Sequence, residues 1–383
     1  MSLRLEVYNE SAATIWILLS DGQSNPSSLA ASFAEIYGLT IDQASEDVEA
    51  CFSEWIARGW VQREISGTCH ISEPKHQLGT PEPSPTSIPA AKLVHQRTHK
   101  FGPAAFSLEL YEVSPQGSDG IAARIQAVTS GFPMTSTPAS GISSGLQVVS
   151  DGNLTYLGDS QGNVKTSTDT ASAYSEILWR IFHLAHPKAD PVGFFHAAAL
   201  SKTRTVIFPG VSGSGKTTLS AYLAHHGWCY YGDDTIGLTL RRDCAPVGVV
   251  LPMPTALSVK DGSVEILRTF YPSLSDLSTV RYGGKTVRYL PIQAPGSTEP
   301  PETREVAAIV FPTYLPGVAL HSNTITPVEA LSRLISGGMA LQAGIGEAAL
   351  ENFLEFICSV PIYELNYSDL QEAESWLGAL AEK

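Results

Sequence analysis

The sequence predicts an α/β protein that contains a strand, a glycine-rich loop and a helix in succession, preceded by a small helical domain. Three observations carry this prediction. Residues 210–217 match the pattern GxxxxGK(S/T) between a β-branched run and a helical apolar pattern. Residues 1–72 show three helical patterns followed by an alternating strand pattern. The Pro-rich segment 73–92 separates them from residues 93–383, so we expect two domains joined by a linker.

Composition and charge restrict the classes of protein. Hydrophobic residues make up 43% of the 383 residues, which excludes global disorder. The net charge of −14 argues against a nucleic-acid partner. Apolar runs such as 15–19 and 306–311 are shorter than the roughly 20 residues that cross a bilayer, and the first residues lack a secretory signal. Five widely spaced cysteines without a CxxC pair indicate reduced thiols. We expect a cytoplasmic protein with no membrane partner.

The N-terminal domain has the outline of a winged helix. We expect a helix over Ser11–Leu19 capped by Asn9, a second over Ser28–Tyr37, and a third that starts with a capping box at Thr40. A strand pattern at 60–65 follows. Residues 1–75 contain 11 acidic and 4 basic side chains, and a domain this acidic is repelled by DNA phosphate.

The segment 6–19 (EVYNESAATIWILL), followed by Asp21 and Gly22, resembles the PqqD family over residues 3–66. The resemblance implies recognition of the leader of a ribosomally made precursor peptide, which adds as a strand to a sheet edge. In this comparison the chain starts where the third strand of the family would lie, and we expect the preceding hairpin to be missing. The alternative is a helical accessory domain used for packing or dimerisation.

The pattern at 210–217 indicates a nucleotide site. A strand over 203–208 enters the loop, and a helix over 217–226 leaves it and stops at Gly227. Backbone N–H groups of such a loop and the helix N-terminus bind phosphates, the lysine reaches the β- and γ-phosphates, and the threonine hydroxyl binds Mg²⁺. We therefore expect ATP and Mg²⁺ as cofactors. The residues expected to bind the nucleotide are Gly210, Ser212, Gly213, Ser214, Gly215, Lys216, Thr217 and Thr218.

Two adjacent carboxylates follow the next predicted strand. Asp233 and Asp234 come 17 and 18 residues after Lys216, so one helix and one return strand can carry them back to the loop. One carboxylate can hold Mg²⁺ and the other can accept a proton from an attacking hydroxyl; the alternative is a simple turn. His196 lies in an apolar segment and is either a core residue or a partner of Asp234.

These features together resemble the catalytic domain of HPr kinase/phosphorylase, which is similar in core fold to phosphoenolpyruvate carboxykinase. The resemblance covers about residues 93–370 and is specific at 193–240. It implies an α/β P-loop kinase fold of the HPr kinase/PEP carboxykinase type. By this resemblance His196 is an accessory histidine, Lys216 and Thr217 bind phosphate and Mg²⁺, Asp234 is the proton acceptor, and Asp233 supports the metal or the loop.

The sequence departs from that family after the aspartate pair. Where the family has a second metal carboxylate, residues 252–260 contain no acid, and the next ones are Asp261 and Glu265. Lys260 is a candidate for charge neutralisation in its place. Candidates for the late arginine of the family remain open among Arg281, Arg288 and Arg304. For each of these basic residues the alternative is an ordinary surface charge.

The sequence thus predicts a kinase that transfers the γ-phosphoryl group of ATP to a Ser or Thr hydroxyl of a peptide or small protein. The N-terminal domain would hold that peptide. Two alternatives remain: a kinase of a free small metabolite, and a non-catalytic module that binds peptide in a nucleotide-dependent way. A homo-oligomer is compatible with the resemblance. Helical patterns at 327–336 and 346–357 predict helices that cover the core near the C-terminus.

Overall fold

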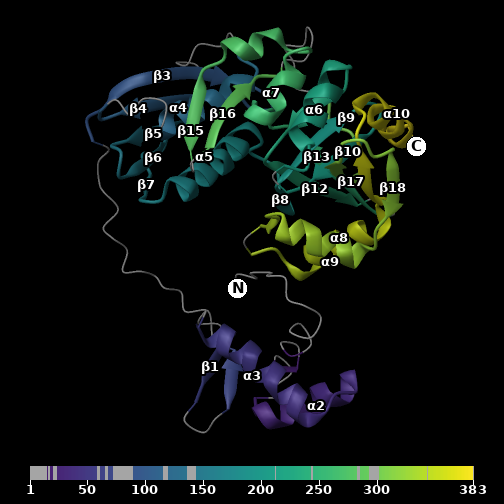
Figure 1. Ribbon diagram of the computed structural model, residues 1–383. Helices are drawn as coiled ribbons and strands as arrows, with labels where there is room; N and C mark the ends of the chain where they lie inside the picture. Colours follow the sequence, from purple (N-terminus) through teal and green to yellow (C-terminus); the bar gives the residue numbers. More distant parts are fainter. Residues whose placement is uncertain are drawn as a thin grey trace. The chain divides into compact units, whose positions relative to one another are not determined.

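The computed structural model has a mixed α/β fold and divides into two compact units, Met1–Glu82 and Pro83–Lys383 (Figure 1). The described residues are 15, 18, 19, 24–57, 61–64, 68–71, 89–114, 120–135, 144–211, 213–242, 245–282, 285–292, 302–342 and 344–382. Most of the predicted linker 73–92 lies outside them. Its last residue, Lys92, begins strand β3 and is therefore not part of a linker.

The described part of the N-terminal unit includes helices α2 and α3, each capped at its start, and a hairpin. Helix α2 (Pro26–Tyr37) starts at Asn25, whose side chain accepts hydrogen bonds from two backbone N–H groups, and ends at Gly38 with a φ of 64°. Helix α3 (Ile41–Ala57) starts with the predicted capping box, in which Thr40 and Gln43 bond reciprocally. Strands β1 (Val61–Arg63) and β2 (Cys69–Ile71) pair antiparallel. Asn9 and most of its predicted helix lie outside the described residues; Ile15, Leu18 and Leu19 are helical.

Apolar side chains from both helices close a separate core in this unit. Phe33 on α2 and Phe52 and Trp55 on α3 are fully buried, and Val61 on β1 packs with them. The spacing of these residues follows the helical period that the sequence shows. The burial explains why helices of 12 and 17 residues are stable here, because packing of an apolar face supplies most of the stability of short helices.

The strands described in the C-terminal unit form four sheets. The central one has six strands in the order β11-β9-β10-β17-β20-β18, with β10, β17 and β20 parallel and the others antiparallel to their neighbours. Its strands, in that order, are Cys229–Gly232, Ala197–Ser201, Thr205–Pro209, Val306–Tyr314, Ile362–Tyr367 and His321–Thr324. Strands β9 and β10 are buried along their whole length, as expected for a sheet covered on both faces.

Alternate residues of β9 and β10 pack into two different cores, one on each face of this sheet. Leu200, Val206 and Phe208 pack with helices α6 (Lys216–His225) and α10 (Leu370–Ala381). On the other face, Ala199 and Ile207 pack with helices α8 (Pro327–Ser336) and α9 (Glu347–Ser359), and with β12 (Ile236–Arg242) and β13 (Pro246–Leu251). This alternation fixes the register of β10 in the sheet. The register in turn fixes the position at which β10 ends and the glycine loop begins.

Three smaller sheets flank the central one. The first has the order β13-β12-β8-β19, where β8 is Gly193–Phe195 and β19 is Ala340–Leu341. The second has the order β14-β16-β15 (Leu257–Lys260, Lys285–Leu290, Thr279–Tyr282). The short helix α7 (Asp261–Leu267) directly follows β14. The third runs in sequence order from β3 to β7 and comprises Lys92–His99, Phe106–Glu112, Gly145–Ser150, Thr155–Asp159 and Val164–Ser167. Short 3₁₀ turns occur at Thr129–Gly131 and Pro272–Asp276.

Helices α4 (Ile121–Val128) and α5 (Thr170–Ala185) pack on the five-stranded sheet and on each other (Figure 1). Their apolar faces share a core with Val287 and Tyr289 of β16. The five-stranded layer is therefore joined to the three-stranded sheet by one continuous core. Within the described part of the chain, no helix is long and apolar enough to cross a membrane.

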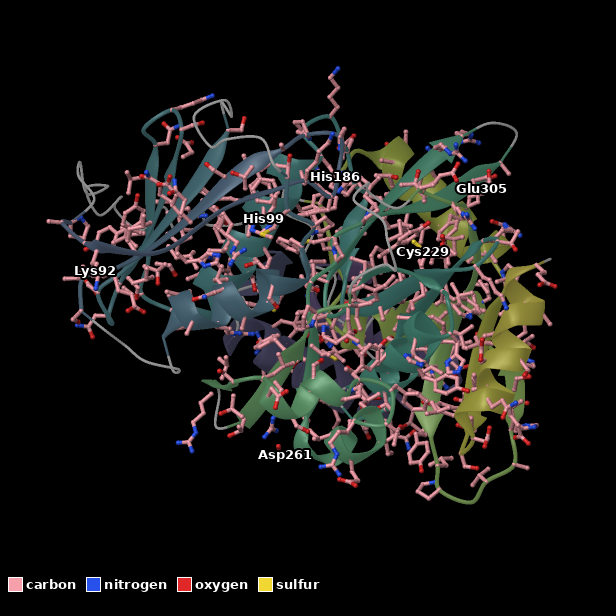
Figure 2. All side chains as sticks on the ribbon, turned by 90° about the horizontal axis from the view of Figure 1, so that it is seen from above. Lys92, His99, His186, Cys229, Asp261 and Glu305 are labelled. Atoms are coloured by element: carbon pink, nitrogen blue, oxygen red, sulfur yellow. The ribbon has the colours of Figure 1, made fainter. Side chains whose placement is uncertain are left out.

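His99 is a buried titratable group in this layer. Its ring packs against Phe106 and Phe132, is 1% exposed, and makes no hydrogen bond of normal geometry with described residues. Figure 2 labels it together with His186, whose ring nitrogen Nε2 lies 2.8 Å from the carbonyl oxygen of Pro252. Burial, together with the charges of His95 and Arg97, lowers the pKa of His99 to about 4. The folded protein therefore holds His99 neutral.

We predict that His99→Phe makes the C-terminal unit less sensitive to acid. A histidine in the unfolded chain has a pKa near 6.5, so between pH 6.5 and 4 the unfolded chain binds a proton at this residue and the folded chain does not. The free energy of unfolding therefore decreases as the pH falls from 6.5 towards 4. His99 alone then costs about 2 kcal/mol of unfolding free energy between pH 7 and pH 5. Urea unfolding at both pH values should show a smaller pH effect in the variant by this amount. An identical pH effect in both proteins would contradict the buried neutral state.

Candidate functional site

The glycine loop follows β10 and leads directly into α6. Gly213 and Gly215 have φ values of 96° and 93°, a region that favours glycine. A Cβ atom at Gly215 would lie 2.8 Å from Cβ of Tyr314 and 2.8 Å from the hydroxyl of Tyr367, so this position also lacks room for a side chain. Ser212, one of the predicted nucleotide-binding residues, lies outside the described residues.

The start of α6 offers hydrogen-bond donors to the cleft beside it. No side chain caps the helix at Gly215, and the first N–H groups of a helix have no partner within it. The hydroxyl of Ser214 is buried and has no hydrogen-bond partner among the described residues. Together with the positive end of the helix dipole, these donors form a cradle for an anion. Gly210, Gly213, Ser214, Gly215, Lys216, Thr217 and Thr218 all belong to this segment.

The carboxylate of Asp233 joins the loop to the turn after β11. Its Oδ2 accepts a hydrogen bond of 3.0 Å from the hydroxyl of Thr217, and its Oδ1 lies 3.6 Å from Nζ of Lys216. Asp233 is 1% and Lys216 6% exposed. The predicted return of the aspartate pair to the loop therefore occurs in the structure, and Asp233 is the member that contacts the loop.

Asp234 points in a different direction because the backbone turns sharply between the two residues. Its φ is 67°, the only positive value for a non-glycine residue in the described part of the chain. Aspartate tolerates this left-handed region better than most residues. Asp233 Oδ1 accepts the Asp234 N–H, and the Asp233 carbonyl accepts the hydroxyl of the buried Thr255 at 3.0 Å. Because of this turn, the Asp233 carboxylate lies in the interior and the Asp234 carboxylate lines the cleft.

His196 contacts both the lysine and the aspartate turn, but not as the sequence suggested. Its Nδ1 lies 2.8 Å from the backbone carbonyl oxygen of Asp234, and the expected pair with the Asp234 carboxylate is not formed. A carbonyl accepts only, so Nδ1 carries the proton and Nε2 presents a lone pair. That lone pair faces Nζ of Lys216 at 3.5 Å. His196 therefore orients Lys216 and the turn.

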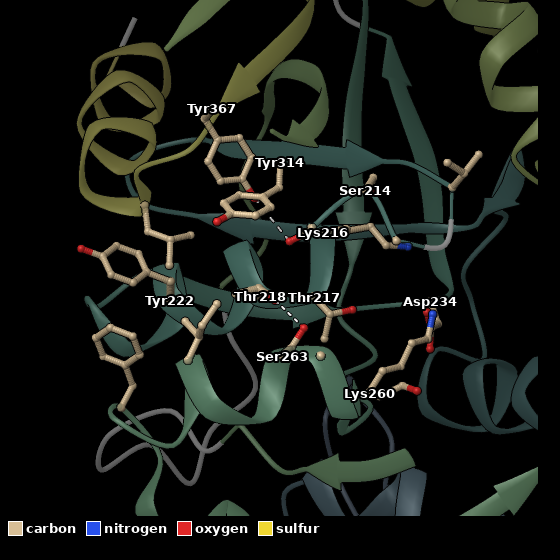
Figure 3. A pocket seen from close by; sticks show the side chains of 18 of the residues that line it. Ser214, Lys216, Thr217, Thr218, Tyr222, Asp234, Lys260, Ser263, Tyr314 and Tyr367 are labelled. Atoms are coloured by element: carbon tan, nitrogen blue, oxygen red, sulfur yellow. Dashed lines mark hydrogen bonds between the residues drawn. The ribbon is translucent and has the colours of Figure 1, made fainter. Parts of the chain in front are cut away.

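The pKa of the Asp234 carboxyl is raised. Burial is the main cause, and the neighbouring negative charge of Asp233 adds to it. The positive charges of Lys216 and Lys260 oppose the shift without cancelling it. Figure 3 shows the Lys260 side chain extending from the end of β14 towards Asp234. A raised pKa suits a carboxylate that accepts a proton near neutral pH.

The loop, Lys216 and Asp234 line one cleft of about 920 Å³. Five Tyr and Phe rings also line it, and four of them form two pairs: Tyr314 with Tyr367 at 5.8 Å between centroids, and Tyr222 with Phe270 at 5.3 Å (Figure 3). Below the loop, the hydroxyl of Thr218 donates to that of Ser263 at 2.9 Å. The cleft has the size of a small-molecule site, and polar and charged residues make up much of its lining beside the aromatic rings.

The basic residues that line the cleft differ from those proposed for the late arginine. Arg281, Arg288 and Arg304 are not among its lining residues; Arg288, for example, pairs with Asp261 at 3.1 Å. Lys260 does line it, as does Arg124 on α4. Arg124 was missed because it lies in an amphipathic helix with no motif around it, more than 80 residues before the glycine loop.

Comparison with known proteins adds information on the N-terminal unit. Residues 5–61 match the family of coenzyme PQQ synthesis protein D (PqqD). The predicted PqqD domain is thereby supported. The match covers α2 and α3 and ends at the first residue of β1. It leaves the whole cleft outside, since every lining residue lies in the C-terminal unit.

Beyond the PqqD domain the comparisons are weak. No curated protein matches the chain. Among solved structures, the Hpr(Ser) kinase/phosphatase from Coxiella burnetii is similar with 12% identity over 49% of this chain and 93% of that one, at a TM-score of 0.23. A TM-score this low does not establish a common fold. The kinase assignment of the C-terminal unit therefore stays a hypothesis that depends on its residues and their geometry.

We predict that Asp234→Asn stabilises the protein at neutral pH. The folded state raises the pKa of this carboxyl, so ionisation of Asp234 lowers the free energy of unfolding at pH values above the raised pKa. This loss of stability disappears as the pH falls below the ordinary pKa near 4, where the carboxyl is protonated in both states. Asparagine removes the charge and tolerates the left-handed backbone. The melting temperature should rise by about 2–4 °C at pH 7.

The difference in melting temperature should narrow as the pH is lowered to 4. The exposed Asp276 provides the control, because Asp276→Asn removes a carboxylate outside the cleft and should leave the melting temperature unchanged. An Asp234→Asn variant that melts below the wild type at pH 7 would show that the ionised carboxylate stabilises the turn.

Proposed function

We propose that the protein is an ATP-dependent kinase that transfers the γ-phosphoryl group to a hydroxyl of a peptide or small protein. The observation that carries this proposal is that Lys216, Thr217 and Asp234 line one cleft at the glycine loop. The buried Asp233 contacts Lys216 and Thr217 from behind. A phosphoryl-transfer site needs a phosphate cradle, a cation beside it and a group that accepts the proton of the nucleophile. Each requirement has a separate residue here.

The glycine loop and the N-terminus of α6 are suited to the phosphates of ATP. The loop glycines allow the backbone to approach the ligand closely, and the first N–H groups of α6 supply donors. Lys216 supplies the cation and is held by Asp233 and His196. The aromatic pairs Tyr314–Tyr367 and Tyr222–Phe270 supply apolar surface for the remainder of the nucleotide.

The residues also fit Mg²⁺. The hydroxyl of Thr217 and the carboxylate of Asp233 are oxygen donors held 3.0 Å apart beside the loop. Mg²⁺ prefers oxygen ligands and binds in kinases through one or two carboxylates together with substrate phosphates. The described residues contain no group of three or more His, Cys, Asp and Glu side chains that would hold a metal. When bound, Mg²⁺ would neutralise phosphate charge.

Asp234 is the proposed proton acceptor. It lines the cleft, and its raised pKa makes it a stronger base than an ordinary carboxylate. In the proposed step, the acceptor oxygen bonds to the γ-phosphorus as the bond from that phosphorus to the β–γ bridging oxygen breaks. The hydroxyl proton passes to Asp234, and ADP leaves with the electron pair of the broken bond. Asp233 binds Thr217 and Lys216 and takes no part in this proton transfer.

The PqqD domain supports a peptide as the acceptor. Proteins of that family bind peptide substrates in modification pathways, and a domain of this kind in the same chain raises the local concentration of a bound peptide at the cleft. The acceptor hydroxyl is then that of a Ser or Thr residue.

Transfer of labelled γ-phosphate from ATP tests the proposal. Full-length protein with Mg²⁺ and a randomised Ser/Thr peptide library should incorporate label, and Asp234→Asn should lower the rate by about 10²–10⁴-fold, the usual contribution of a general base. ATP binding, measured by calorimetry, should persist in Asp234→Asn and weaken in Lys216→Ala. A wild type that binds ATP but labels neither peptide nor metabolite would favour a non-catalytic, nucleotide-dependent binding module.

A kinase of a free metabolite is the second candidate, because the cleft is formed entirely by the C-terminal unit. Deletion of residues 1–72 separates the two. A peptide kinase should show a KM for its peptide about 10–100-fold higher in the truncated chain, since tethering raises effective concentration by 10²–10⁴-fold at most. The KM for ATP should not change. An unchanged KM for the acceptor would identify a metabolite kinase.

A further inference from the structure

The turn at the aspartate pair is bonded to an irregular segment, residues 252–256, which connects β13 to β14. All five residues of this segment are buried. A buried segment outside helices and sheets must find other partners for its backbone polar groups. Two of the five residues are prolines, which have no N–H group. The segment therefore contains three backbone N–H groups, those of Met253, Thr255 and Ala256.

Each of these N–H groups has a backbone acceptor. The N–H of Met253 donates to the carbonyl of Tyr231 on β11 at 2.7 Å. The N–H of Thr255 donates to the carbonyl of Met253, also at 2.7 Å. The N–H of Ala256 donates to the carbonyl of Val128, the last residue of α4, at 2.8 Å. The segment is thus bonded both to the strand that leads into the aspartate pair and to a helix of the five-stranded layer.

The backbone of Thr255 is held through its carbonyl as well as its N–H. The hydroxyl of the buried Tyr230 donates to the Thr255 carbonyl at 2.7 Å. The segment also lies very close to β11, since a Cβ atom at Gly232 would be 2.7 Å from the carbonyl oxygen of Met253. Bonds on both sides of Thr255 and this close packing determine where its side chain begins.

From this position the side chain of Thr255 reaches the turn. Its hydroxyl donates to the carbonyl of Asp233 at 3.0 Å, and the same carbonyl accepts the N–H of Thr235 at 2.9 Å. The next carbonyl, that of Asp234, lies 2.8 Å from Nδ1 of His196. Thr255 is 2% exposed and does not line the cleft. It therefore cannot touch a ligand in the cleft and acts only through the turn.

The peptide group that joins Asp233 to Asp234 is bound at both ends. Its carbonyl accepts the hydroxyl of Thr255, and its N–H donates to Oδ1 of Asp233. The orientation of this peptide group sets the φ of Asp234, which is 67°. A left-handed φ is less favourable than a right-handed one for any residue with a Cβ atom. Rotation of the peptide group out of this arrangement would break the bond to Thr255, so the hydroxyl stabilises the left-handed turn.

We propose that Thr255 is a positioning residue that holds the left-handed turn and thereby keeps the Asp234 carboxylate in the cleft. The inference deepens the proposed kinase function and rests on it for the effect on catalysis. The transfer step itself is unchanged, and Thr255 contacts neither the nucleotide nor the acceptor.

Two replacements at Thr255 separate the hydroxyl from the rest of the side chain. Thr255→Val keeps the shape without the hydroxyl, and Thr255→Ser keeps the hydroxyl without the methyl group. With full-length protein, Mg²⁺, labelled ATP and the Ser/Thr peptide library, Thr255→Val should transfer label about 10–100-fold more slowly at saturating ATP, as small displacements of a catalytic group do. The KM for ATP should not change. Thr255→Ser should restore most of the rate.

Hydrogen exchange at the turn gives a second measurement that does not depend on transfer. Without the Thr255 hydroxyl the turn should open more often, so the amides of residues 232–238 should exchange about 5–10-fold faster in Thr255→Val, the effect of losing one hydrogen bond. Thr255→Ser should exchange like the wild type. Mass spectrometry of the peptide fragment that contains these residues measures both variants, and thermal melting verifies that they fold.

Thr205→Val is the matched control. Thr205 is also buried, its hydroxyl donates to the carbonyl of Arg304 at 2.9 Å, and it does not line the cleft. This replacement removes a comparable hydrogen bond from a part of the unit that does not hold the turn. It should leave the rate of transfer and the exchange of residues 232–238 unchanged.

The order of the two variants decides the inference. If Thr255→Ser were slower than Thr255→Val, Thr255 would act by packing and the inference would be overturned. Equal exchange at the turn in both variants and the wild type would overturn it as well, and so would a raised KM for ATP with an unchanged rate. A wild type that binds ATP without transferring label would instead overturn the proposed function, and the exchange measurement would still decide whether the hydroxyl holds the turn.

Discussion

The buried carboxylate of Asp233 is the interaction on which the cleft depends. Its oxygens contact Lys216 and Thr217, the first two residues of α6, and accept the N–H of Asp234 at the turn. The carboxylate thereby joins the glycine loop to the turn after β11, two segments that α6 and β11 separate in the sequence. Lys216 and Asp233 are both almost completely buried, and a buried pair that loses one partner typically costs 3–5 kcal/mol. Such a pair contributes little net stability but permits few alternative geometries. The distance between the glycine loop and Asp234 is thereby set.

The parts of the structure that local chemistry determines were predictable. The Thr40–Gln43 capping box and the helix at 327–336 occur where the sequence places them. Helix α6 begins one residue before its predicted start and ends one residue before its predicted end, because the glycine loop and Gly227 delimit it. The return of Asp233 to the loop was also predictable, since one short helix and one strand leave the chain little choice of path.

Contacts between distant segments were not predictable from the residues alone. His196 has the same sequence environment whether its ring binds the carboxylate or the backbone oxygen of Asp234, and only the left-handed turn decides between them. Arg124 enters the cleft because α4 packs against α5 and the three-stranded sheet, and the apolar pattern of α4 specifies burial without specifying a partner. The nucleotide and metal remain proposals because the residues suit them while the comparisons cover only the PqqD domain.

The left-handed backbone at Asp234 limits what evolution can place there. Only glycine, asparagine and aspartate adopt such a φ with little strain, and a single base change converts an aspartate codon into a codon for either of the others. Both replacements fit the turn and leave the Asp233 contacts in place, but they remove the carboxylate to which the proposed function assigns the proton. Under the proposed function, a lineage would therefore become a pseudokinase in one mutational step, with its fold retained.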